Sequence, residues 1–117
     1  MKILDGGNVC SAKGFQASGL NCGVKEGVKD LALVYSEVEA SGAAVYTKNR
    51  VRAAPIQVCR EHLEDGQARA VVLNSGNANA CTGEEGLGNA RRMGALTAEQ
   101  VGVGAEDVLV CSTGGIG

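Results

Sequence analysis

The sequence predicts an α/β fold, in which short strands alternate with helices. Apolar runs of strand length at residues 68–73 and 107–111 each end in a polar or glycine-rich segment. Between these two runs, residues 83–101 carry an apolar pattern with helical spacing. Apolar residues make up 44% of the chain, which indicates a globular core rather than disorder. We therefore expect residues 1–117 to form a single domain or part of one.

The first third of the chain predicts antiparallel strands. Residues 15–24 alternate partially between apolar and polar side chains, and residues 30–36 form a clearer apolar run. Residues 43–47 follow a Ser-Gly pair and are expected to be the hairpin partner of that run. Because the three segments lie so close in sequence, short antiparallel connections are the natural way to join them.

A short helix followed by a buried strand is predicted in the middle of the chain. Pro55 suits the first turn of a helix, and apolar residues recur at helical spacing over residues 55–64. The strand at 68–73 then leads into a polar run at 74–79, whose sequence is Asn-Ser-Gly-Asn-Ala-Asn. Three asparagines there could bind a ligand, but a helix-entry turn with locally satisfied side chains is the interpretation we favour.

The long helix is expected at residues 83–101. Thr82 and Glu85 have the spacing of a capping box, which would fix its first turn. Gly86, Gly88 and Gly94 lie inside this helix and would each cost it about 1 kcal/mol relative to alanine. Their presence predicts close packing against a neighbouring element.

Composition excludes several classes of function. The net charge is −2 with acids and bases interspersed, and the chain has one Phe, two Tyr and no Trp. Neither a basic patch nor an aromatic platform for nucleic acid is therefore expected, nor a surface for anionic lipid. No stretch has transmembrane length, and the first ten residues lack the features of a signal peptide. We expect a cytoplasmic chain whose partner is a small molecule or another protein.

The cysteines and the single histidine do not predict a metal site. Five cysteines are spread along the chain without a Cys-x-x-Cys pair, so reduced thiols are expected and no metal cofactor. His62 lies beside Glu61 and Glu64 on the short predicted helix, where a solvated face is the simplest interpretation. A Cys-His nucleophilic pair has no supporting local context.

The clearest candidate for chemistry is the glycine-rich segment at residues 112–117. Successive glycines allow backbone N–H groups to converge on a phosphate or a developing oxyanion, and the Thr113 hydroxyl could add a donor. The spacing matches neither a Walker A loop nor a dinucleotide fingerprint. Considered alone, such a turn is more often structural. Residues 49–52 form a small basic cluster, expected to be a solvated loop or an anion contact.

Together these segments resemble the bifunctional ornithine acetyltransferase / glutamate N-acetyltransferase family of arginine biosynthesis. The most specific match is the run NSGNANACTG at residues 74–83. The order and spacing of the other matching runs extend the resemblance over nearly the whole chain, at residues 13–15, 30–33, 46–55 and 112–117. The chain stops at the glycine-rich turn, where another element should follow, so we expect a truncated or proteolysed chain.

The resemblance implies the N-terminal portion of a layered α/β sandwich of the ornithine acetyltransferase / self-cleaving aminopeptidase type. Such proteins cleave themselves before an internal threonine into an α and a β chain, which assemble as an α2β2 heterotetramer. The new N-terminal threonine of the β chain carries acetyl from N2-acetylornithine to glutamate by a ping-pong mechanism. Thr113 and Gly114 would form the oxyanion hole. No cofactor is implied; whether acetyl-CoA also serves as a co-substrate stays open.

This sequence also departs from the family pattern. Gly115 stands where a larger aliphatic residue is common, and no Ala-Thr-Met-type cleavage site is present. The nucleophile would lie beyond Gly117, so the fragment alone is expected to be inactive. Two alternatives remain open: a non-catalytic domain that binds a small molecule or anion, and a related self-cleaving aminopeptidase. The run at residues 74–83 favours the acetyltransferase.

Overall fold

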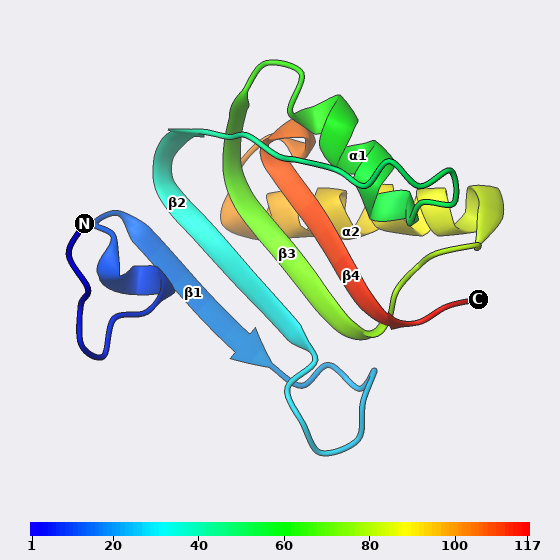
Figure 1. Ribbon diagram of the computed structural model, residues 1–117, viewed down its shortest axis with the longest axis horizontal. Helices are drawn as coiled ribbons and strands as arrows, with labels where there is room; N and C mark the ends of the chain where they lie inside the picture. Colours follow the sequence, from blue (N-terminus) through cyan, green and yellow to red (C-terminus); the bar gives the residue numbers. More distant parts are fainter.

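The computed structural model describes all 117 residues and contains one four-stranded sheet with two helices (Figure 1). The strands lie in chain order across the sheet: β1 (Phe15–Leu20), β2 (Leu31–Ser41), β3 (Gln67–Asn77) and β4 (Val108–Gly115). The helices are α1 (Ala54–His62) and α2 (Gly83–Val101), with short 3-10 turns at η1 (Val9–Ser11) and η2 (Ala105–Asp107). The predicted α/β class is confirmed.

The sheet is antiparallel in its first half and parallel in its second. β1 pairs with β2 and β2 with β3 in antiparallel register, whereas β3 and β4 run parallel. The parallel pair is joined through α2, which lies behind these strands in Figure 1. A crossover helix of this kind brings the carboxyl ends of β3 and β4 to the same end of the sheet.

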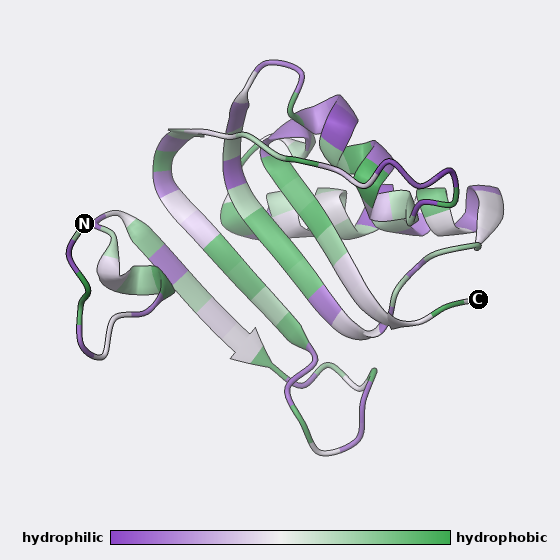
Figure 2. Cartoon of the chain, viewed as in Figure 1, coloured by the Kyte–Doolittle hydropathy of each residue, from purple (hydrophilic) through white to green (hydrophobic).

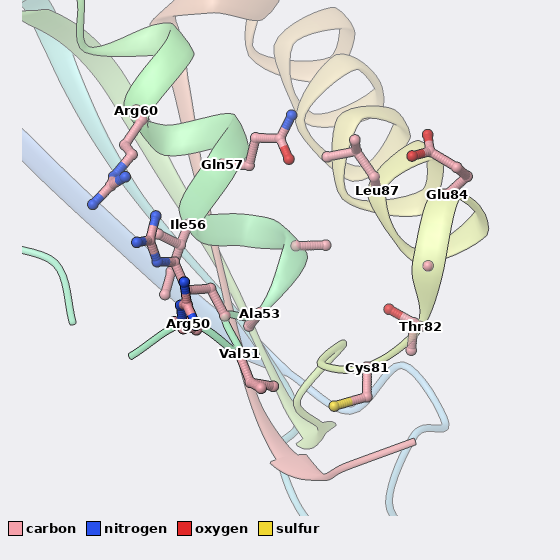
Figure 3. Close-up of a pocket in the computed structure, with 13 residues that line it drawn as sticks. Arg50, Val51, Ala53, Ile56, Gln57, Arg60, Cys81, Thr82, Glu84 and Leu87 are labelled. Carbon is pink, nitrogen blue, oxygen red and sulfur yellow. The ribbon is translucent and has the colours of Figure 1, made fainter. Parts of the chain in front are cut away.

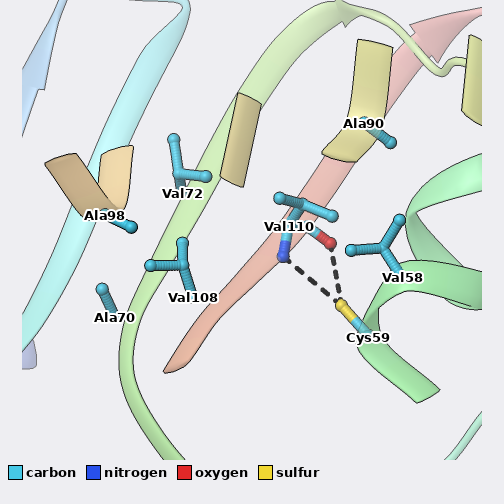
Figure 4. Packing of buried hydrophobic residues seen from close by; sticks show 8 residues of the cluster. All are labelled: Val58, Cys59, Ala70, Val72, Ala90, Ala98, Val108 and Val110. Carbon is cyan, nitrogen blue, oxygen red and sulfur yellow. Dashed lines mark hydrogen bonds between the residues drawn. The ribbon is translucent and has the colours of Figure 1, made fainter. Parts of the chain in front are cut away.

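The core lies between the sheet and α2. Because side chains alternate along a strand, Ala70 and Val72 of β3 and Val108 and Val110 of β4 point to the same face, and all four are buried. Figure 4 shows these small side chains packed with others from α1 and α2. In Figure 2 the apolar colour of β3 gives way to polar residues near its carboxyl end. The apolar part of β3 therefore lies in the core, and the strand continues into a polar carboxyl end.

α1 covers the outer edge of β4. The buried Cys59 thiol donates to the Val110 carbonyl at 3.1 Å and lies 3.4 Å from the Val110 N–H (Figure 4). His62 Nδ1 lies 2.7 Å from the Val108 carbonyl oxygen, so the prediction of a solvated histidine was wrong. An edge strand otherwise presents unpaired backbone groups to water, and these two side chains satisfy them.

The predicted hairpin strand at residues 43–47 is not formed. Both edges of β2 are already occupied, by β1 on one side and β3 on the other. Residues 43–47 therefore cannot pair with β2, and they run towards α1 without regular secondary structure.

α2 has the predicted bounds but not the predicted cap. The Thr82 side chain makes no capping bond; its hydroxyl donates to Asn79 Oδ1 at 2.6 Å. The capping box was therefore wrong. Close packing is confirmed at Gly86, where a Cβ would collide with Thr82 and Asn79, and at Gly94, where it would lie 3.4 Å from Val110. Gly88 has no neighbour within 4 Å, so close packing does not explain it.

The sheet face opposite α2 carries no helix. By strand alternation this face presents Val34, Val71, Leu73 and Leu109, all half-buried. Neither helix of the chain is long and apolar enough to cross a membrane. The sheet therefore has one packed face and one apolar face that no helix of this chain covers.

Candidate functional site

The polar run at residues 74–79 and the glycine-rich segment at residues 112–117 begin in the adjoining ends of β3 and β4. Ser75 pairs with Thr113, Gly76 with Gly114 and Asn77 with Gly115 in the parallel register. Residues 74–77 and 112–115 are thus strand, and the prediction that the two strands end at residues 73 and 111 was wrong. The parallel pairing brings together two segments that the sequence analysis had treated separately.

The two strands approach very closely where Gly76 meets Gly114. Both residues have positive φ, +120° at Gly76 and +136° at Gly114. A Cβ on Gly114 would lie only 2.6 Å from the Asn77 backbone nitrogen, which no real side chain tolerates. We call this close approach of Gly76 and Gly114 the glycine crossing. It requires glycine because φ is positive and because there is no room for a Cβ atom.

Thr113 and Gly114 lie near the carboxyl end of β4, and both residues are exposed. The Thr113 side chain belongs to the helix-free face and is exposed. It lines a cavity of about 430 Å³ over the carboxyl ends of the strands.

The helix-facing side of these strand ends is held by polar contacts. The Ser112 hydroxyl donates to Asn74 Oδ1, and Asn74 Nδ2 donates to the Asn77 carbonyl at 2.9 Å. The Ala78 N–H donates to the Gly115 carbonyl at 2.9 Å, and the Gly117 N–H to the Ala80 carbonyl at 3.1 Å. The asparagine at 74 thus satisfies local groups, as the preferred interpretation of residues 74–79 had it.

Asp30 holds the loop at residues 21–29 beside the glycine crossing. Its buried carboxylate accepts hydrogen bonds from the N–H groups of Cys22 and Lys25, each at 2.7 Å. Its backbone carbonyl accepts from the Ser75 N–H at 2.8 Å. Val24 and Lys25 are thereby packed against Gly76, where a Cβ would meet Val24 at 2.6 Å. This contact was not predicted; an aspartate directly before an apolar strand was the available signal in the sequence.

The Asp30 carboxylate predicts a loss of stability in acid. Backbone hydrogen bonds from Cys22 and then Lys25 lower the pKa of Asp30 to about 2, from an ordinary 3.8. A group with a lowered folded-state pKa contributes stability above its unfolded pKa and loses it as pH falls. We expect this contribution to disappear between about pH 4 and pH 2, measured by circular dichroism during acid titration.

Asp30→Asn tests this expectation at neutral pH. The amide keeps one acceptor oxygen but no charge, so the thermal midpoint should fall by several degrees and depend less on pH below 4. Asp65→Asn is the matched control, because Asp65 accepts one exposed hydrogen bond from the Gln67 N–H. Equal losses in the two variants would contradict the role given to Asp30.

The cysteines offer no nucleophile paired with His62. All five thiols are free. Burial raises the pKa of the Cys59 thiol, and Cys59 and His62 each bond to the backbone of β4. No three His, Cys, Asp or Glu side chains are grouped so as to hold a metal ion. Cys59 and His62 therefore each have a structural role against β4 and do not form a nucleophilic pair.

The predicted basic cluster lines a second cavity, of about 530 Å³ (Figure 3). Arg50 and Arg52 come from the connection before α1, and Arg60 joins them from α1 itself. Residues 49–52 were predicted as a basic cluster, but Arg60 was not; it lies one helical turn beyond Ile56 on the same face of α1. The opposite wall comes from the start of α2.

Comparison with known proteins places this geometry in a family. The model of the ArgJ family matches residues 16–117. The chain belongs to the ArgJ family. The resemblance inferred from the sequence motifs is thereby confirmed, and the fold matches the N-terminal portion of solved ArgJ structures.

The relatives are close in sequence and in structure. The chain is 54% identical over its whole length to the arginine biosynthesis bifunctional protein ArgJ of Caldanaerobacter subterraneus, and 49% identical over 112 residues to that of Bacillus subtilis. A crystal structure of the Bacillus halodurans protein matches 97% of the chain with a TM-score of 0.95 and 50% identity. The ornithine acetyltransferase of Mycobacterium tuberculosis, solved with ornithine, matches 93% with a TM-score of 0.84 and 43% identity.

The chain is much shorter than these relatives. It spans 29% of the Caldanaerobacter protein and 28% of the Bacillus subtilis protein. It spans 60% of each of the two crystallised chains. ArgJ family members therefore contain substantial structure beyond the residues described in this chain.

Proposed function

We propose that this chain is the N-terminal part of the α chain of an acetyltransferase that moves acetyl from N2-acetylornithine to glutamate in arginine biosynthesis. The observation that carries the proposal is the 43% identical match, over nearly the whole chain, to an ornithine acetyltransferase solved with ornithine. The match of the family model to residues 16–117 includes the paired ends of β3 and β4.

Within that reaction, Thr113 and Gly114 are assigned to the oxyanion hole. A threonine nucleophile attacks the acetyl carbonyl of the donor, and its oxygen becomes negative in the tetrahedral intermediate. The Thr113 hydroxyl and the Gly114 N–H are exposed donors at one strand end, held by the Gly76–Gly114 crossing. Donors that are already oriented stabilise the developing charge without reorganisation during the reaction.

The rest of the reaction requires parts that this chain does not contain. Ornithine leaves as its amine when the acetyl ester forms on the nucleophile; the glutamate amine then attacks the ester and restores the hydroxyl. We assign the nucleophile to the first residue of a β chain made from the same precursor, in an α2β2 assembly. This chain spans 60% of each crystallised chain but only 28–29% of the full-length relatives, so the crystallised chains are about half as long as those relatives. Cleavage of a precursor into two chains would give this difference in length.

The helix-free face of the sheet supports a layered architecture for the complete protein. Val34, Val71, Leu73 and Leu109 stay half-buried there, and water would contact this apolar surface if nothing packed on it. A second sheet from the remainder of the protein would bury it, giving the sandwich of sheets flanked by helices.

An acetyl-transfer assay on the complete gene product tests the proposed function. We expect N-acetylglutamate to form from N2-acetylornithine and glutamate, with parallel lines in double-reciprocal plots because the mechanism is ping-pong. Acetyl-CoA in place of N2-acetylornithine establishes whether it is a second donor. If the gene product is cleaved properly but transfers no acetyl group, the non-catalytic anion-binding domain becomes the better interpretation. If that product cleaves peptides instead, the aminopeptidase is favoured.

A further inference from the structure

Three arginines gather around one cavity without an acidic partner. Arg50, Arg52 and Arg60 all line the cavity of about 530 Å³ between the connection 49–53, α1 and the start of α2. The chain contains one salt bridge, between Arg91 and Glu61, and none of the three arginines takes part in it. Like charges held together repel one another, and a bound anion is the ordinary way to offset that cost.

Two of these arginines are held in place by neighbouring groups. The Arg60 guanidinium lies 5.0 Å from the centre of the Tyr46 ring, a cation–π distance. Arg52 Nε donates to the Asn49 carbonyl at 2.8 Å, and the Asn49 side chain accepts from the Val51 N–H at 3.1 Å. Both contacts leave terminal guanidinium N–H groups free to meet a ligand.

The cavity is polarised from one end to the other. In Figure 3 the side chains of Arg50 and Arg60 lie on one side of α1, with Arg60 in the last turn of that helix, and Glu84 lies at the other end of the cavity, on α2. The apolar Ile56 and Leu87 also line the cavity. An anionic group is therefore favoured at the arginine end, and the remainder of a larger molecule can extend over apolar side chains towards α2.

We propose that the arginine end of this cavity binds the pyrophosphate or phosphate groups of a phosphorylated small molecule. Guanidinium groups bind phosphate oxygens through paired, charge-assisted hydrogen bonds. Three cations suit a ligand with several negative charges better than a single carboxylate. Neither Thr113 nor Gly114 lines this cavity, and Thr113 lines another one, so binding at the arginines is measured without acetyl transfer.

Isothermal titration calorimetry of the complete protein with inorganic pyrophosphate tests the site. We expect one pyrophosphate per chain, with binding that weakens as salt is raised. The double variant Arg50→Gln/Arg60→Gln should lose about tenfold in affinity for each arginine, since each loses a charge-assisted contact. Arg50→Lys/Arg60→Lys should fall between the two, because lysine keeps the charge without the planar fork.

Arg92→Gln is the matched control, because Arg92 is an exposed arginine of α2 that does not line the cavity. It should bind pyrophosphate like the unmodified protein. Absence of pyrophosphate binding, wild-type affinity in the double variant, or an equal loss in Arg92→Gln would each overturn the proposal. Thermal unfolding of every variant verifies that the arginine changes leave the fold intact.

Competition distinguishes the possible sources of the phosphate. Displacement of pyrophosphate by coenzyme A at lower concentration than by inorganic phosphate would assign the site to a phosphorylated acyl carrier. Displacement by inorganic phosphate with no advantage for coenzyme A would assign it to a free phosphate. Either result requires the same three arginines, so both support the site. If an acetyl-transfer assay fails while pyrophosphate binds, only the proposed function is lost.

Discussion

Gly114→Ala is expected to destabilise the chain by about 3 kcal/mol or more and to remove acetyl transfer from the complete enzyme. The added Cβ would lie 2.6 Å from the Asn77 nitrogen and closer still to the Gly76 backbone. Backbone atoms of a paired strand cannot move aside as a side-chain end can. The φ of +136° adds strain for any L-residue other than glycine. Urea unfolding followed by circular dichroism measures the change in free energy.

The neighbouring Gly115→Ala is a closely matched control. It adds the same methyl group one residue further along β4, where φ is not positive and the nearest atom is the Gly76 carbonyl oxygen at 3.8 Å. We expect its unfolding free energy to change by less than about 1 kcal/mol. A Gly114→Ala variant as stable as Gly115→Ala would mean that the two strands separate at little cost, and the crossing would not fix the donor positions.

Local chemistry made the helices predictable from sequence. Pro55 marks the first turn of α1, and Asp65-Gly66 follows its end. The bounds of α2 follow from its apolar spacing, because Ala90, Gly94 and Ala98 are buried on one side. The same reasoning misassigned residues 43–47, since β propensity says nothing about which strand edges are already occupied.

The candidate site depends on contacts between distant parts of the chain, and sequence patterns predicted only some of its residues. Thr113 and Gly114 were identified because glycines following a strand are visible in the sequence. Asp30 was not identified, because its role comes from backbone groups of its own loop and from the pairing of β2 with β3. Arg60 likewise joins Arg50 only after α1 has packed beside the connection that precedes it.

Under the proposed function, Thr113→Ala in the complete enzyme should lower the turnover number about 100- to 1,000-fold, the usual cost of one oxyanion donor. The effect should fall on both half-reactions, because each passes through a tetrahedral intermediate with a negative oxygen. Autocatalytic cleavage must be checked first on a denaturing gel. In a variant that cleaves normally, a loss of activity is due to acetyl transfer and not to failed maturation. Single-turnover release of ornithine then reports formation of the acetyl-enzyme separately from its consumption by glutamate.

Thr113→Ser decides between loss of a donor and loss of structure. Serine keeps the hydroxyl but removes the methyl group, so it should retain most of the turnover if donation to the oxyanion is what Thr113 provides. Because the Thr113 side chain is exposed on the helix-free face, neither change should alter the stability of the isolated chain by more than about 1 kcal/mol. If serine is as inactive as alanine while both variants stay folded and cleaved, the hydroxyl is not the donor. The Gly114 N–H would then be the remaining candidate donor in this chain.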